Sequence, residues 1–160
     1  MIDMDFIEQI RDLSKSIPAK LESIKTEEAT KNALVLPFLA ALGYNVFEPT
    51  EVIPEFIADF GPMKREKIDY LIKIDKKAMI LIECKQADCD LDQVSLKQLF
   101  SYFGNGEAPF AILTNGLIYR FYSDLEKQNK MDLKPFFEFD MRNIKEPLVE
   151  EFKEVREIFI

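Results

Sequence analysis

The first apolar pattern in the chain has helical spacing. Phe6, Ile10 and Leu13 recur at intervals of four and three residues. This spacing predicts an amphipathic helix over Asp5–Ser16, with its apolar side facing a core. Because proline disfavours the helical conformation of the residue before it, we expect this helix to end before Pro18.

A second helix is expected a few residues later. Thr26 is a suitable N-cap, and Glu27 and Glu28 follow it in the first turn, where carboxylates interact favourably with the helix dipole. The apolar pattern then continues to Gly43, which is a typical residue just past a helix end. Pro37 falls inside this helix, so we expect a kink or break there.

Beyond the second helix, β-type segments dominate, with Gly-Pro, Asn-Gly and charged turns between them. The expected strands are Val52–Asp59, Lys67–Ile74, Ala78–Cys84, Pro109–Thr114, Leu117–Ser123 and Phe136–Phe139. The expected later helices are Asp92–Phe103 and Glu146–Ile160, the second with Leu148, Phe152, Val155 and Phe159 on one face. This order predicts an α/β protein with a mixed sheet.

Length and composition restrict the function classes. The 160 residues suit a single domain over residues 1–160, and the absence of histidine excludes Ser-His and Cys-His nucleophile pairs. The 21 basic and 29 acidic residues give a net charge of −8, which argues against nucleic-acid binding by bulk positive charge. The chain has no apolar stretch long enough to cross a membrane and no secretory signal pattern, so we expect a cytoplasmic protein.

One strand end combines charges that need a structural reason. The apolar run Ala78–Ile82 predicts a buried central strand, and Glu83 and Lys85 follow it. The two-residue period of a strand puts both side chains on the same face, with Cys84 on the other. Charges at the end of a buried strand therefore indicate either a functional site or an ion pair.

The preceding hairpin brings a second carboxylate to this position. If Asp75–Lys77 forms a three-residue loop, Ile74 pairs with Ala78 and Asp69 lies opposite Glu83. Two carboxylates on opposed strand positions repel each other unless a cation lies between them. The register therefore predicts a site for a cation.

Oxygen ligands select a hard cation such as Mg²⁺, which is commonly bound by one or two carboxylates together with phosphate oxygens of a substrate. Lys85 is placed to orient a water molecule or to stabilise charge on a phosphorus centre. This chemistry hydrolyses a phosphodiester without histidine. The alternative is a simple Glu83–Lys85 ion pair, with Asp69 turned to solvent.

A family resemblance follows from several motifs along the chain. They are Thr26–Lys31, Leu36–Leu39, Leu42–Tyr44, Glu66–Tyr70, Leu81–Lys85, Gln98–Tyr102 and Leu113–Gly116. Together they resemble the N-terminal nuclease domain of type I restriction enzyme R (motor) subunits and of related stand-alone or prophage proteins, over roughly residues 20–125. That family belongs to the PD-(D/E)xK nuclease superfamily. The resemblance implies a restriction-endonuclease-like mixed β-sheet flanked by α-helices, with an αβββαβ core.

The resemblance also implies roles for individual residues. Asp69 and Glu83 are similar to the metal-binding carboxylates, and Lys85 is similar to the catalytic lysine. The main-chain carbonyl of Cys84 is implied as a further metal ligand. The expected metal is Mg²⁺, with Mn²⁺ as a substitute.

Two helical elements complete the implied site. Glu27 best fits the family's acidic-x-x-x-basic spacing with Lys31, although its neighbour Glu28 stays open as an alternative. Gln98 and Tyr102 resemble the Gln-x-x-x-Tyr element of the family, which implies a role in supporting the site or in contacting DNA. The alternative for this pair is ordinary packing on an amphipathic helix.

The resemblance implies DNA as the substrate. The stretch from Met63 to Lys85 is net positive in an acidic protein, so Lys64 and Lys67 are expected to contact DNA. We expect a Mg²⁺-dependent DNA endonuclease without the helicase motor, because no Gly-x-x-x-x-Gly-Lys-[Ser/Thr] loop is present.

Expected partners are motor or specificity subunits, or a second copy of the chain. The alternative functions are a catalytically silent docking module for DNA or protein, and a dimerisation domain that uses Phe152 and Phe159.

Overall fold

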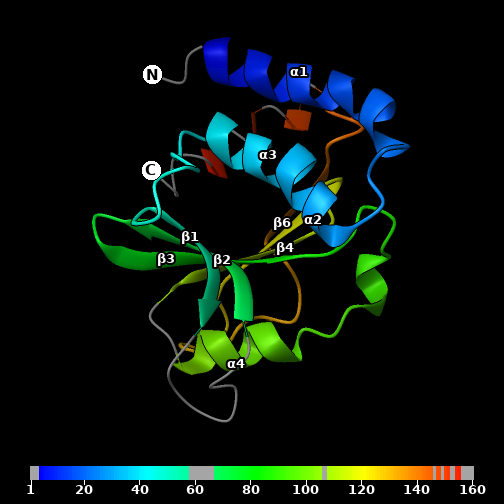
Figure 1. Cartoon of the computed structure of the whole chain (residues 1–160). Coiled ribbons are helices and arrows are strands. Elements are labelled where there is room, and N and C mark those ends of the chain that lie inside the picture. Colours follow the sequence, from blue (N-terminus) through cyan, green and yellow to red (C-terminus); the bar gives the residue numbers. More distant parts are fainter. Residues whose placement is uncertain are drawn as a thin grey trace.

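The computed structural model describes residues 4–57, 67–105, 108–145, 147–148, 150–151 and 154–155. Its centre is a six-stranded sheet in which the strands lie side by side in chain order, from β1 to β6 (Figure 1). The strands are β1 Val52–Ile57, β2 Lys67–Ile74, β3 Lys77–Cys84, β4 Phe110–Thr114, β5 Ile118–Tyr122 and β6 Phe137–Asp140. Strands β3 and β4 pair in parallel and the other neighbours pair antiparallel, which confirms the mixed sheet.

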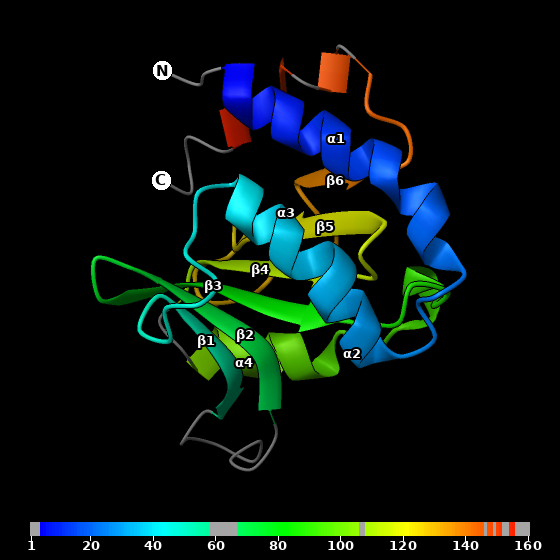
Figure 2. The same cartoon turned by 45° about the horizontal axis from the view of Figure 1, so that its top comes forward.

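Helices cover both faces of this sheet. They are α1 Met4–Leu21, α2 Glu27–Thr30, α3 Leu36–Ala41 and α4 Lys97–Asn105, with a π-helical turn η1 Lys31–Val35 and a 3₁₀ turn η2 Leu91–Gln93. Helices α1 to α3 lie over one face and α4 lies under the other (Figures 1 and 2). The arrangement confirms the restriction-endonuclease-like fold class, with its αβββαβ core followed by β5 and β6.

Strand alternation divides the apolar residues into two layers. Ile80 and Ile82 of β3 join the larger layer under α1 to α3, whereas Leu81 joins the smaller layer against α4. Strand β4 alternates in the same way, with Ile112 in the larger layer and its neighbours in the smaller one. The central strands are therefore buried on both sides, as their continuous apolar runs predicted.

Helix α1 is longer than the sequence predicted. It continues through Pro18 to Leu21, because the apolar stripe extends to Ile17, which is almost fully buried. The free energy gained by burying this side chain offsets the cost of the helical hydrogen bond that Pro18 cannot donate. The predicted helix end before Pro18 is therefore wrong.

The second predicted helix has its irregularity before Pro37 rather than at it. Thr26 caps α2 as expected, since its side-chain oxygen accepts a hydrogen bond from the main-chain N–H of Ala29. A π-helical turn then separates α2 from α3, and the N–H of Leu36 donates to the carbonyl of Lys31. Pro37 lies at the start of α3, where its missing N–H costs less.

The β2–β3 hairpin has a shorter loop than predicted. Asp75 and Lys76 both have positive φ angles, of 51° and 66°, as the two central residues of a type I′ turn require. Ile74 therefore pairs with Lys77, not with Ala78, and a β-bulge between Ile72 and Lys73 shifts the register by one residue. On the side of the bulge away from the turn, from Tyr70 to Ile72, the two strands have the register that the three-residue loop had predicted.

The predicted helix Asp92–Phe103 is divided. Asp90 caps the short turn η2 by accepting the N–H of Asp92, and Val94 then returns to an extended conformation. Helix α4 begins only at Lys97, whose N–H donates to the side-chain oxygen of Ser95. These local side-chain acceptors compete with a continuous helix over this segment.

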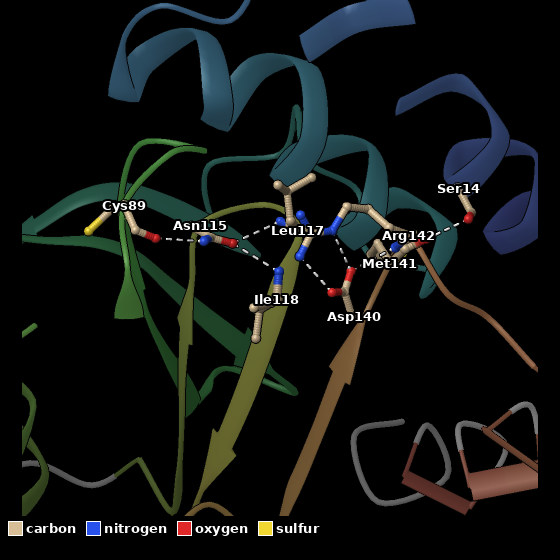
Figure 3. A network of polar contacts seen from close by, with 8 residues as sticks. All are labelled: Ser14, Cys89, Asn115, Leu117, Ile118, Asp140, Met141 and Arg142. Carbon is tan, nitrogen blue, oxygen red and sulfur yellow. Dashed lines mark hydrogen bonds and ion pairs between the residues drawn. The ribbon is translucent and has the colours of Figure 1, made fainter. Parts of the chain in front are cut away.

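The predicted Asn-Gly turn joins β4 to β5. The side-chain oxygen of Asn115 accepts the N–H groups of Leu117 and Ile118, and its amide donates to the carbonyl of Cys89 (Figure 3). Gly116 has a φ of 83°, and a Cβ there would lie 2.8 Å from Leu34 Cδ1. The turn therefore lies directly under the π-helical turn η1.

Around the end of β6, polar contacts attach α1 to the sheet. The side chain of Ser14 donates to the carbonyl of Met141, and Arg142 forms an ion pair with Asp140 at 2.7 Å (Figure 3).

In the predicted C-terminal helix, described residues such as Leu148 and Val155 are helical and pack against the larger layer. Phe152 and Phe159 lie outside the described residues. Within the described part of the chain, no helix is long and apolar enough to cross a membrane.

The contact between Gly116 and η1 gives a first prediction. Gly116→Ala should lower the free energy of unfolding by about 2 kcal/mol or more, because the new methyl group meets Leu34 and the backbone has a positive φ. Urea denaturation followed by circular dichroism measures this loss. In a Leu34→Gly background, which removes both the Cδ1 and the Cβ atom that the new methyl group would meet, the same substitution should cost clearly less. An equal cost in both backgrounds would contradict the steric explanation.

Candidate metal and nuclease site

Asp69 and Glu83 lie at the same end of the sheet. The β2–β3 register pairs Tyr70 with Ile82, and one further step brings Asp69 opposite Glu83. Asp69 Oδ2 accepts a hydrogen bond from the main-chain N–H of Cys84 at 2.7 Å. The Asp69 side chain is only 15% exposed, so it does not turn away to solvent.

The Glu83 carboxyl is buried and incompletely paired. Its Oε2 atom has no hydrogen-bond partner, and its Oε1 atom lies 3.7 Å from Lys85 Nζ. Burial raises the pKa of Glu83 to about 8, and the neighbouring Asp69 carboxylate contributes to this rise. The site thus contains a carboxyl group that favours its protonated form near neutral pH in the absence of a further cation.

Lys31 is the residue at this site to which the sequence assigned no role of its own. Its Nζ lies 2.6 Å from Asp69 Oδ1 and 3.8 Å from Glu28 Oε2, and its side chain is only 12% exposed. Burial lowers its pKa, but the hydrogen bond and charge of Asp69 outweigh this and raise the pKa of Lys31 above its ordinary value. Lys31 is therefore a largely buried ammonium group held against a carboxylate. The acidic-x-x-x-basic spacing was the only sequence signal for it.

Packing of α2 onto the chain after β3 brings Lys31 and the helical acids to the site. The side-chain oxygen of Thr30, which is fully buried, accepts the N–H of Ala87 at 3.0 Å. Glu27 is exposed, and its charge contributes to the raised pKa of Glu83. Glu28 instead forms an ion pair with Lys31. Of the two helical acids, Glu27 is the one whose charge acts on Glu83.

Gln98 and Tyr102 of α4 contact the sheet in different ways. The Gln98 side-chain amide donates to the main-chain carbonyl of Lys67 at 2.8 Å, which attaches α4 to the start of β2. Tyr102 is 1% exposed and belongs to the smaller apolar layer. Gln98 is half-buried and fixes the start of the strand that carries Asp69, whereas Tyr102 is a core residue.

The basic residues expected to contact DNA occupy different environments. Lys67 is exposed at the start of β2 and lies 3.7 Å from Glu55, whereas Lys64 lies outside the described residues. Arg120, a further basic residue, is paired with Asp92 at 2.7 Å and with Glu138 at 3.2 Å. Arg120 of β5 thus connects the turn η2, in the crossover between β3 and β4, to strand β6.

The donor set at this strand end fits a hard divalent cation. It contains two carboxylates, and one buried carboxylate oxygen has no partner. However, in the described part of the chain no three acidic or thiol groups already stand in a metal-binding cluster. Glu27 therefore does not stand with Asp69 and Glu83 in such a group.

The chain is similar to known proteins in sequence and in structure. The family model for the type I restriction enzyme R protein N terminus matches residues 26–136, which include both carboxylates and Lys31. The chain belongs to this family. No curated protein matches the sequence. Among solved structures, a chain of the cryo-EM structure of a DrdV–DNA complex is similar, with 14% sequence identity and a TM-score of 0.48. The alignment covers 93% of this chain and 15% of the other, so this chain spans a small part of that protein's length.

The type I restriction R family match covers every residue that carried the resemblance in the sequence. It includes Thr26 at the cap of α2, the Asp69 and Glu83 carboxylates, and the Asn115-Gly116 turn. Helix α1 lies outside the matched range but packs on the same apolar layer as α3. The family relationship therefore applies to the part of the fold that builds the site.

The buried carboxyl gives a prediction for pH dependence. Since the pKa of Glu83 is about 8 when folded and near 4.5 otherwise, the folded state binds a proton that the unfolded state releases between these values. In EDTA, the free energy of unfolding should therefore fall as pH rises through this window, by up to about 1.4 kcal/mol per pH unit. The absence of histidine keeps other side chains from obscuring this slope.

Urea denaturation at pH 5.5 and pH 7.5 measures the effect. Glu83→Gln should be nearly insensitive to pH over this interval and more stable than the wild type at pH 7.5. The matched control is Glu8→Gln, which removes an exposed carboxylate of α1 and should keep the wild-type slope. A wild-type slope in Glu83→Gln would contradict the assignment.

Proposed function

We propose that this chain is a Mg²⁺-dependent DNA endonuclease, with Mn²⁺ as a substitute metal. The observation that carries the proposal is the meeting of Asp69 and Glu83 at the end of β2 and β3, with Lys85 Nζ 3.7 Å from Glu83 Oε1. Membership of the type I restriction R family and a fold of the restriction-endonuclease class support it.

In this proposal each residue has a distinct task. Asp69, Glu83 and the main-chain carbonyl of Cys84 hold the metal, and Glu27 is the helical acid that completes the site. When bound, the metal supplies Lewis-acid polarisation of the scissile phosphate. Lys85 is one-third exposed, so its ammonium group is accessible for orienting an attacking water or stabilising charge on phosphate oxygens.

Substrate contacts are proposed for the exposed residues at the start of β2. Lys67 presents a positive charge there, and Lys64 precedes it in the net-positive stretch. Gln98 fixes the backbone of Lys67 by its hydrogen bond, and buried Tyr102 holds α4 in place. A motor or specificity subunit, or a second copy of the chain, would supply the further DNA affinity that an acidic protein lacks.

Metal binding and cleavage together test the proposal. Wild-type protein should bind Mg²⁺ or Mn²⁺ in isothermal titration calorimetry and nick supercoiled plasmid. Asp69→Asn should lose both properties, because it removes a charged metal ligand. Lys85→Met should retain metal binding and lose about 100-fold or more in nicking rate, because it removes a group that acts on the reacting phosphate.

The matched control for charge is Asp75→Asn at the hairpin tip. Asp75 is exposed and its positive φ is tolerated by asparagine, so metal binding and nicking should stay at the wild-type level. Nicking that persists in Asp69→Asn would contradict the proposal. DNA binding that needs no metal, with no cleavage under any condition, would instead support a docking module.

A further inference from the structure

A largely buried lysine forms an ion pair with one of the two site carboxylates. Lys31 Nζ lies 2.6 Å from Asp69 Oδ1, which is the distance of a strong charge-assisted hydrogen bond. Both side chains are largely withdrawn from solvent, and the Tyr70 ring lies 6.0 Å from the same ammonium group. A pair so placed is screened far less by water and salt than a surface ion pair.

The fold holds Lys31 at this position from several directions. Lys31 begins the π-helical turn η1, and its carbonyl accepts the N–H of Leu36. One residue earlier, Thr30 is attached to the chain after β3 through Ala87. The helical turn that ends at Lys31 is thus attached to the chain that follows β3. Single π-helical turns are frequent at functional sites, where they redirect a side chain.

The ammonium group satisfies the carboxylate that a metal ion would need. Asp69 Oδ2 accepts the Cys84 N–H, while Oδ1 faces Lys31. A divalent cation on Asp69 would meet the positive charge of Lys31 at close range, where two like charges repel strongly. Both cations cannot keep the same close contact with Oδ1.

We propose that Lys31 is a tethered cation that holds the Asp69 carboxylate in the metal-free protein and competes with the divalent metal for it. The inference deepens the proposed function and depends on it, because it requires that a metal binds at Asp69. Lys31 is a positioning residue in this scheme: it fixes the Asp69 carboxylate before metal binds, and it sets how much metal is needed.

Lys85 does not share this role. Its Nζ lies 3.7 Å from Glu83 Oε1, and its side chain is 33% exposed, so it approaches the other carboxylate from a more accessible side. Each lysine therefore lies next to a different carboxylate, Lys31 next to Asp69 and Lys85 next to Glu83. Removal of Lys31 should strengthen metal binding, and the removal of an ordinary structural ion pair should weaken it.

Calorimetric titration with Mn²⁺ tests the competition. Lys31→Met should bind Mn²⁺ about tenfold more tightly than the wild type, because the metal no longer displaces a cation. Lys31→Arg keeps the charge and should bind close to the wild-type level. Lys15→Met removes an exposed charge from α1 and controls for the change in net charge. Equal or weaker binding by Lys31→Met overturns the proposal.

Stability in EDTA gives a readout that needs no metal. Lys31→Met should lower the urea midpoint of the wild type but not that of Asp69→Asn, because the partner carboxylate is then neutral. Saturating Mn²⁺ should abolish the loss. An equal loss in both backgrounds overturns the proposal. If Lys31→Met is unfolded in EDTA, folding on addition of Mn²⁺, followed by circular dichroism, supports it, and failure to fold overturns it.

The outcomes separate this inference from the proposed function. Wild-type binding of Mn²⁺ with no gain in Lys31→Met overturns the competition and leaves the metal site standing. Absence of Mn²⁺ binding by both proteins overturns both ideas together.

Discussion

The pairing of β2 with β3 places the two strand carboxylates of the candidate site. A two-residue turn at Asp75 and Lys76 closes the hairpin, and a bulge after Ile72 shifts the register by one. A shift of one residue in a strand moves every side chain to the opposite face. Without the bulge, Asp69 would not stand opposite Glu83, and the apolar residues of β2 would face the wrong layer. The irregularity therefore places both the core and the carboxylates.

Once the register brings two carboxylates together, their charge has to be balanced inside a partly dry environment. The structure uses two means. Glu83 has its pKa raised to about 8 by burial and by Asp69, while Lys31 and Lys85 each face one carboxylate. Leaving a buried charge unpaired costs several kcal/mol, roughly, so these compensations are as necessary to the fold as the apolar layers. The same groups are the ones that a metal would engage.

The sequence predicted the fold class and the position of the carboxylates, but not how they are held. An apolar run followed by Glu83 and Lys85 is a local signal, and it survives errors elsewhere. The register was predicted from a three-residue loop, and the error was offset by the unforeseen bulge. Lys31 had no assigned role because its contact with Asp69 is tertiary, and helix spacing does not reveal which strand lies beneath it. For the same reason spacing could not separate Glu27 from Glu28, whose charges act on different partners.

Local charge, rather than net charge, governs how such an acidic chain could approach DNA. The site contains four carboxylates, at Glu27, Glu28, Asp69 and Glu83, and two lysines, at Lys31 and Lys85, so its formal charge is two minus four, or −2, when all are ionised. A phosphate group near this cluster is repelled unless positive charge is added or protons are retained. One divalent cation would neutralise it. Under the proposed function, metal binding and phosphate binding at this strand end are therefore coupled, and the lysine on Asp69 is part of the same balance.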